Sequence, residues 1–172
     1  RDSIYPDRLI ALMGEDILAN VDASASDEAK TIIYDVKCSM NVETAILNAG
    51  GVPHMARTGH SFMKRVLAEM PECKMAAKMS GHIFFNDRWP GFDDGIYAAA
   101  RLLEILSELE KSDTLFENLP HLYSTPEINL PSSDEEKFKI VDAFKNALNF
   151  PEAKLIDSDV VRLEYPNGWG IL

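Results

Sequence analysis

The sequence predicts an α/β protein: a layered domain with a mixed or largely parallel sheet flanked by helices, followed by a truncated α+β unit. Apolar residues recur at helical spacing in several segments, and short apolar and β-branched runs of strand length alternate with them. Residues 112–132 contain three prolines and show no strong period. We therefore expect one domain over residues 1–111, a linker over 112–132, and a partial second unit over 133–172.

The first half of the chain alternates between expected helices and strands. A helix is expected from Pro6, because proline suits the first turn of a helix. Residues 31–36 (TIIYDV) are typical of a buried strand. Ser39 is expected to cap a second helix that ends at the Gly50–Gly51 pair, and residues 52–56 (VPHMA) indicate a second strand.

The region that follows contains two polar turns. RTGHS forms the first turn, with Ser61 able to cap the helix after it. Residues 74–80 and 82–86 flank a Ser-Gly-His turn and both have extended character. Asp93 and Asp94 are expected to cap a long amphipathic helix.

The second unit begins where three acidic residues follow Ser133, a pattern that favours a helix start. Residues 153–157 and 160–165 are expected to be short strands, and 166–172 look like the start of another. A helix beside a small antiparallel sheet is an α+β unit.

The overall charge excludes some partners. The net charge of −11 argues against a nucleic-acid surface or an anionic membrane surface, and no apolar run reaches the length of a membrane helix. Between Lys37 and Arg88, however, seven Lys or Arg stand against four Asp or Glu. This segment could hold a small anionic ligand, although charge runs usually only solvate a surface.

The cysteines and histidines restrict the redox and metal chemistry that we expect. Only Cys38 and Cys73 occur, so free thiols in a cytoplasmic protein are favoured over a Cys38–Cys73 disulfide. No Cys-x-x-Cys or His-x-x-x-His spacing is present, and we therefore expect no metal site. The four histidines are His54, His60, His82 and His121.

Three polar loops follow the first three expected strands, at residues 37–39, 57–61 and 78–82. Ligands bind outside the carboxyl ends of parallel strands, so we expect these loops to converge.

Each loop suggests a ligand group. Arg57 and His60 beside a helix start suit a phosphate, though a capped helix with a surface arginine is the alternative. Lys37 could also contact a phosphate or simply be exposed. Ser80, Gly81 and His82 suit sugar hydroxyls, because they combine donors, acceptors and an accessible backbone.

Four segments resemble the α-D-phosphohexomutases, and more narrowly the bacterial phosphomannomutase/phosphoglucomutase branch. They are YDVKCS, RTGHSFMK, MSGHIFFNDRWPGFDDGIYAAARLLEIL and YSTPEINLP…DEEKF, and the similarity extends from IYPDRL to YPNGWGIL. The resemblance implies the family's third domain, about Ile4 to Lys111, plus the first part of its fourth. Family members interconvert 1-phospho and 6-phospho hexoses through a bisphosphorylated intermediate.

The resemblance also implies roles for individual residues. Lys37 and His60 match residues that line the cleft near the phosphosugar, and His60 is a candidate proton-transfer group. Ser80 matches a contact to a sugar hydroxyl, and His82 lies in the same loop. The phosphoserine loop and the Asp-rich loop that binds magnesium are absent from this sequence. A full-length member would need them, together with Mg²⁺ and a glucose or mannose 1,6-bisphosphate activator.

The chain departs from the family motif at Lys78. The motif has a glutamate there, which accepts hydrogen bonds from two adjacent sugar hydroxyls. Lysine offers three donors and no acceptor and reverses the charge, so it is unsuited to that contact. Two hypotheses follow: a phosphosugar-recognition part of a mutase that is inactive alone, or a non-catalytic α/β module that binds or assembles. A nucleotide-binding domain is less favoured, because no Gly-x-Gly-x-x-Gly turn is present.

Overall fold

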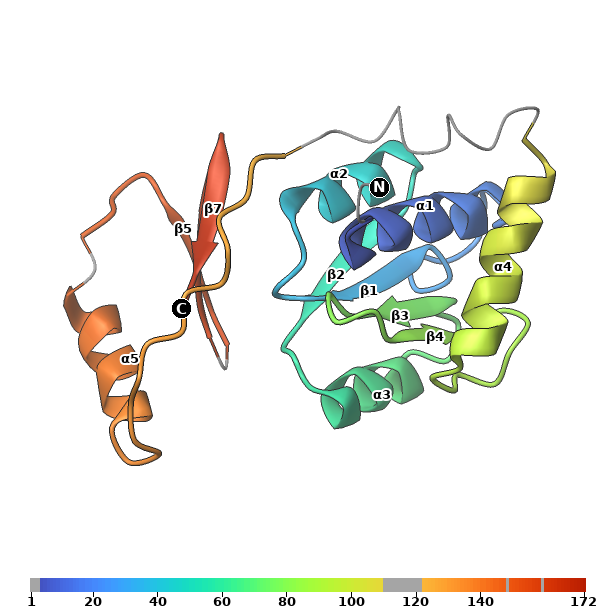
Figure 1. The fold of residues 1–172 in the computed structure, drawn as a ribbon. Helices are drawn as coiled ribbons and strands as arrows, with labels where there is room; N and C mark the ends of the chain where they lie inside the picture. The colour runs from blue at the N-terminus through green and yellow to red at the C-terminus, as the bar shows by residue number, and fades with distance from the viewer. Residues whose placement is uncertain (1–3, 110–121, 148, 159) are drawn as a thin grey trace. The chain divides into compact units, whose positions relative to one another are not determined.

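The computed structural model describes residues 4–109, 122–147, 149–158 and 160–172 (Figure 1). It divides into two compact units, Arg1–Pro120 and His121–Leu172. The expected linker over 112–132 remains a prediction, because residues 110–121, which include Lys111 and His121, lie outside the described residues.

The first unit is built on a four-stranded sheet in the order β2-β1-β3-β4. The strands are β1 (Thr31–Asp35), β2 (Val52–Ala56), β3 (Met75–Ala77) and β4 (Ile83–Phe85). β1 runs parallel to β2 and β3, whereas β4 returns antiparallel to β3 across the Ser-Gly-His turn. The predicted mixed, largely parallel sheet is therefore confirmed.

Helices cover both faces of this sheet (Figure 1). They are α1 (Pro6–Ala19), α2 (Met40–Asn48), α3 (His60–Glu69) and α4 (Gly95–Ser107). Side chains alternate along β1, so Ile32 and Tyr34 pack with residues of α1, α2 and α4 on one face, and Ile33 packs with α3 on the other. Burial on both faces explains the nearly continuous apolar run at 31–36.

The helix starts only partly follow the prediction. Ser39 occupies the N-cap position of α2, but its side chain makes no capping hydrogen bond. The expected cap at Ser61 is wrong, because α3 begins one residue earlier at His60 and Gly59 precedes it. Gly59 has φ of 126°, a conformation that favours glycine, and a Cβ there would lie 2.8 Å from the Phe62 ring.

Asp93 and Asp94 have different roles. Asp94 alone caps α4, since its Oδ1 accepts hydrogen bonds from the backbone N–H groups of Ile96 (2.9 Å) and Tyr97 (3.0 Å). The expectation that Asp93 also caps the helix is wrong. Its carboxylate turns instead towards the Ser-Gly-His turn, and an antiparallel bridge to Phe84 holds its backbone.

The second unit is a helix and an antiparallel sheet of order β5-β6-β7, as predicted. Its elements are α5 (Lys137–Ala147), β5 (Lys154–Asp157), β6 (Val161–Tyr165) and β7 (Gly168–Ile171). Ahead of α5, the Ser133 hydroxyl donates to Glu136 Oε2 (2.9 Å) and accepts from the Glu136 backbone N–H (3.3 Å). Glu136 Oε2 also accepts from the Ser133 backbone N–H (3.4 Å), and this bond together with the one from the Glu136 N–H to the Ser133 hydroxyl forms a capping box, which explains why the helix starts here.

Both cysteines are buried free thiols, which confirms the prediction over the disulfide alternative. Burial is the main reason that the pKa of Cys73 is raised to about 11. Among the described residues, no helix is both long and apolar enough to cross a bilayer.

Candidate functional site

The loops after β1, β2 and β3 leave the same edge of the sheet, because these three strands are parallel. Asp35, at the end of β1, joins the first two loops. Its Oδ1 accepts from the backbone N–H of Lys37 (2.8 Å), and its Oδ2 accepts from the Thr58 hydroxyl (3.3 Å). Asp35 is 1% exposed, so these bonds satisfy a buried carboxylate and fix both loops.

The second and third loops meet at one carboxylate oxygen. Oδ2 of Asp93 lies 2.9 Å from Nε2 of His60 and 2.7 Å from Nδ1 of His82. The two imidazole rings stand edge to face with centroids 5.2 Å apart, and the His60 ring also packs at 5.0 Å against Phe84. The predicted convergence of the two loops is therefore present, and Asp93 is its centre.

The shared carboxylate fixes where the histidine hydrogens lie. A carboxylate only accepts hydrogen bonds, so Nε2 of His60 and Nδ1 of His82 are the donors. Nδ1 of His60 and Nε2 of His82 are thereby the nitrogens that can exchange a proton with a ligand. Burial opposes ionisation of Asp93, but the hydrogen bonds from both histidines outweigh it and hold the pKa of Asp93 below its ordinary value.

The Ser-Gly-His turn is held by its backbone. The N–H of Lys78 donates to the carbonyl of His82, and the N–H of Gly81 donates to the carbonyl of Lys78, both at 2.9 Å. Gly81 has φ of 88°, which explains a glycine here. Ser80 is exposed, and its hydroxyl makes no hydrogen bond within the described parts of the chain.

The predicted cations lie on the loops at this edge. Lys37 and Arg57 are exposed, and the Arg57 guanidinium lies 3.9 Å above the Phe62 ring at the start of α3. Lys78 is half-buried, and no hydrogen bond or ion pair to its ammonium group occurs among the described residues. The structure thus joins His60 to His82, and it places Lys37, Arg57 and Lys78 on the loops beside them.

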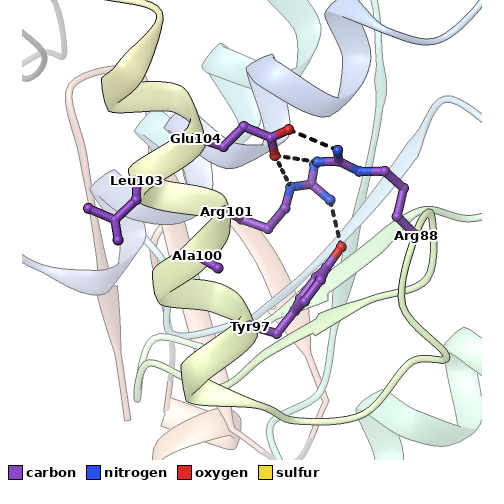
Figure 2. Close-up of a pocket in the computed structure, with 6 residues that line it drawn as sticks. All are labelled: Arg88, Tyr97, Ala100, Arg101, Leu103 and Glu104. Carbon is purple, nitrogen blue, oxygen red and sulfur yellow. Dashed lines mark hydrogen bonds and ion pairs between the residues drawn. The ribbon is translucent and has the colours of Figure 1, made fainter.

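A separate hollow lies along α4 (Figure 2). Its lining residues are Arg88, Tyr97, Ala100, Arg101, Leu103 and Glu104. Arg101 is 5% exposed and pairs with Asp87 at 2.6 Å, while Arg88 pairs with Glu104 at 2.5 Å. The charged side chains around this hollow already form ion pairs with one another. We therefore interpret it as the contact between α4 and the loop after β4, rather than as a ligand site.

Sequence reasoning missed Asp93. The sequence pattern predicts that both Asp93 and Asp94 cap the helix, whereas a single side chain, that of Asp94, supplies the capping hydrogen bonds of α4. The surplus aspartate, eleven residues after His82, was the available signal. Its contact with His60 spans 33 residues, and sequence spacing does not reveal contacts at such a separation.

Comparisons with known proteins agree on one family. The model of "Phosphoglucomutase/phosphomannomutase, alpha/beta/alpha domain III" matches residues 5–123. A phosphomannomutase/phosphoglucomutase of Pseudomonas putida is 45% identical over 98% of this chain and 35% of its own length. A phosphoglucomutase of Neisseria meningitidis is 39% identical over 98% of the chain and 36% of its own length. The chain therefore spans about a third of these relatives.

A solved structure gives the same result. The crystal structure of a phosphoglucomutase/phosphomannomutase family protein from Burkholderia thailandensis superposes with a TM-score of 0.84 at 41% identity. The match covers 96% of this chain and 34% of that protein.

Proposed function

Because the chain belongs to the phosphoglucomutase/phosphomannomutase family and contains its α/β/α domain III, we propose that it supplies the sugar- and phosphate-recognition part of a phosphohexomutase. The full-length protein would interconvert 1-phospho and 6-phospho hexoses through a bisphosphorylated intermediate, in the cytoplasm. The cluster of His60, His82 and Asp93 at the carboxyl edge of the sheet carries the proposal.

The residues at this edge suit the two halves of a phosphosugar. Lys37 and Arg57 are exposed cations that can pair with a phosphate. Ser80 and the backbone at Gly81 can contact sugar hydroxyls, because both are exposed in the turn. His60 is the candidate for proton transfer, since Asp93 fixes its orientation.

The remaining parts of the reaction would come from other domains. The serine that carries the phosphoryl group and the magnesium loop have no counterpart in this sequence, so we expect no turnover by the chain alone. The cluster of His60, His82 and Asp93 does not fit magnesium, which prefers six oxygen ligands in an octahedron. Mg²⁺ and the bisphosphate activator are therefore assigned to the full-length protein only.

A second candidate is a non-catalytic module that keeps the fold and has lost the chemistry. Lys78 favours it, because this half-buried residue carries an ammonium group that has no hydrogen-bonding partner among the described residues, and it stands where the family motif has an acceptor for hydroxyls. If the first proposal is right, Lys78→Glu restores this acceptor and should strengthen the response to a phosphosugar.

The test is a titration of the isotope-labelled chain with glucose 1-phosphate or mannose 1-phosphate, followed by amide NMR shifts. The wild type, Lys78→Glu and Lys74→Glu would be compared. Lys74 precedes the other end of β3, so its replacement makes the same charge change away from the site. We expect shifts at Lys37, His60 and residues 80–82, larger in Lys78→Glu than in wild type.

Three results would overturn the proposal. The first result is that the ligand-induced shifts increase equally in Lys78→Glu and Lys74→Glu, which would show a general charge effect. The shifts could map away from the carboxyl edge of the sheet. The third result is that neither the wild type nor Lys78→Glu shows amide shifts at millimolar ligand. The non-catalytic module would then be favoured.

A further inference from the structure

The cluster of His60, His82 and Asp93 has the composition of a metal site, although its members are far apart in sequence. His60 begins α3, His82 precedes β4, and Asp93 precedes the cap of α4. One possible ligand atom from each residue lies within 4.8 Å of the others. Two imidazole nitrogens and one carboxylate oxygen are the donors that zinc, cobalt and nickel ions accept.

The cluster is accessible to solvent. The side chains of His60, His82 and Asp93 are 41%, 45% and 25% exposed, so an ion could enter and keep water in its remaining positions. Ligand bonds to zinc measure about 2.0–2.2 Å, which places tetrahedral ligand atoms roughly 3.3–3.5 Å apart. The two nitrogen–oxygen pairs, now at 2.9 and 2.7 Å, would need to separate slightly, and the two ligand nitrogens already lie within 4.8 Å of each other.

The surroundings already hold the donors in place. The backbone of Asp93 is bridged to Phe84 in β4, and the His60 ring packs edge to face on the Phe84 ring. A backbone turn, closed by the Lys78–His82 hydrogen bond, fixes His82. Three donor atoms on different segments are therefore held close to one another before any ion arrives.

We propose that His60, His82 and Asp93 form a binding site for a divalent transition-metal ion of the zinc, cobalt and nickel class. The ion replaces the two N–H hydrogens that now point at Asp93. Each neutral imidazole moves its hydrogen to its other ring nitrogen, and its lone pair then faces the metal. Asp93 contributes its carboxylate oxygen.

This site overlaps the residues that we assign to phosphosugar recognition, so an ion and a sugar would compete for it. The inference does not depend on the proposed function, however, because ion binding is measurable with the chain alone. A chain that binds metal and ignores phosphosugars would refute one proposal and support the other.

The test uses Co²⁺, whose visible absorption reports its coordination, together with calorimetric titration of Zn²⁺. We expect one ion per chain in the wild type, and at least a ~10-fold loss of affinity in each of His60→Ala, His82→Ala and Asp93→Asn. His54→Ala is the matched control, because His54 is an exposed histidine of β2 outside the cluster. It should bind like the wild type.

Amide NMR spectra of each variant would establish that it is folded. If His82→Ala is not, His60→Ala and Asp93→Asn still decide the question, and Zn²⁺-induced shifts of the His60 and His82 ring nitrogens in the wild type give an independent measurement. The proposal is wrong if millimolar Co²⁺ produces no absorption band. Equal affinity in the wild type and the folded cluster variants would also overturn it.

Discussion

The two units of the chain have different interiors. In the first, the buried side chains are mostly aliphatic and aromatic and lie on both faces of a largely parallel sheet. In the second, Val161 is the one buried hydrophobic residue among those described, and the least exposed side chain is Arg162 at 0%. The Arg162 guanidinium stacks 4.1 Å from the Trp169 ring and donates from Nε to Glu164 at 2.8 Å.

This difference in the two interiors predicts a difference in the stability of the two units. The first unit buries a large apolar core, and the candidate site is mounted on it. The second unit depends on a buried arginine and its partners, and buried ion pairs contribute little net stability. We therefore expect the first unit to be the more stable and to unfold separately. The chain allows a direct check, because its two tryptophans, Trp89 and Trp169, lie one in each unit.

The largest loss of stability is expected from Ile32→Ala. Ile32 lies in β1, an interior strand of the sheet, and is 0% exposed, so its truncation should lower the free energy of unfolding of the first unit by about 2–5 kcal/mol. Leu155→Ala is the counterpart in the second unit, and its side chain is 51% exposed, so less than about 1 kcal/mol is expected.

Urea unfolding followed by fluorescence would be measured in Trp89→Phe and Trp169→Phe backgrounds, so that each transition is assigned to a unit. Ile32→Ala should move only the transition that Trp89 reports. If the Trp169 transition moves equally, the two units unfold as one and the comparison fails.

The fold was predictable because its causes are local. The strand of TIIYDV, the turn at Gly50–Gly51 and the cap at Asp94 each follow from neighbouring residues, and all are present. The edge that carries the site was also predictable, since it follows from the parallel order of the strands. The role of Asp93 was not, because it depends on a contact with His60 that only the folded chain creates.

Arg162→Met is expected to cause a smaller loss of stability, in the second unit. This change leaves the Glu164 carboxylate, 6% exposed, with Lys154 at 3.2 Å as its remaining ion-pair partner among the described residues. We expect a loss of about 2–3 kcal/mol, seen in the transition that Trp169 reports. The double variant Arg162→Met/Glu164→Leu should recover most of it, because no buried charge is left unpaired. Equal losses in the single and double variants would instead show that the guanidinium stabilises the unit mainly through its contact with Trp169.

The smallest effect concerns the site itself and tests whether it contributes to the stability of the first unit. The folded-state pKa of Asp93 is lowered, chiefly because His60 and His82 donate to its carboxylate against the cost of burial. A lowered pKa adds stability above the unfolded value, about 4, and that stability is lost as the pH falls through the folded value. Asp93→Asn should therefore cost less than about 1 kcal/mol near pH 6, and the difference should vanish at strongly acid pH.

Asp94→Asn is the control for this measurement, because it removes the same charge one residue away and asparagine caps a helix about as well as aspartate. The free energy of unfolding of the wild type and both variants would be followed from pH 3 to pH 7 with the Trp89 signal. Only Asp93→Asn should approach the wild type as the carboxylate becomes protonated. If Asp94→Asn follows the same curve, the pH dependence belongs to the general charge of the chain. The histidine cluster would then be positioned by the sheet beneath it rather than by its shared carboxylate.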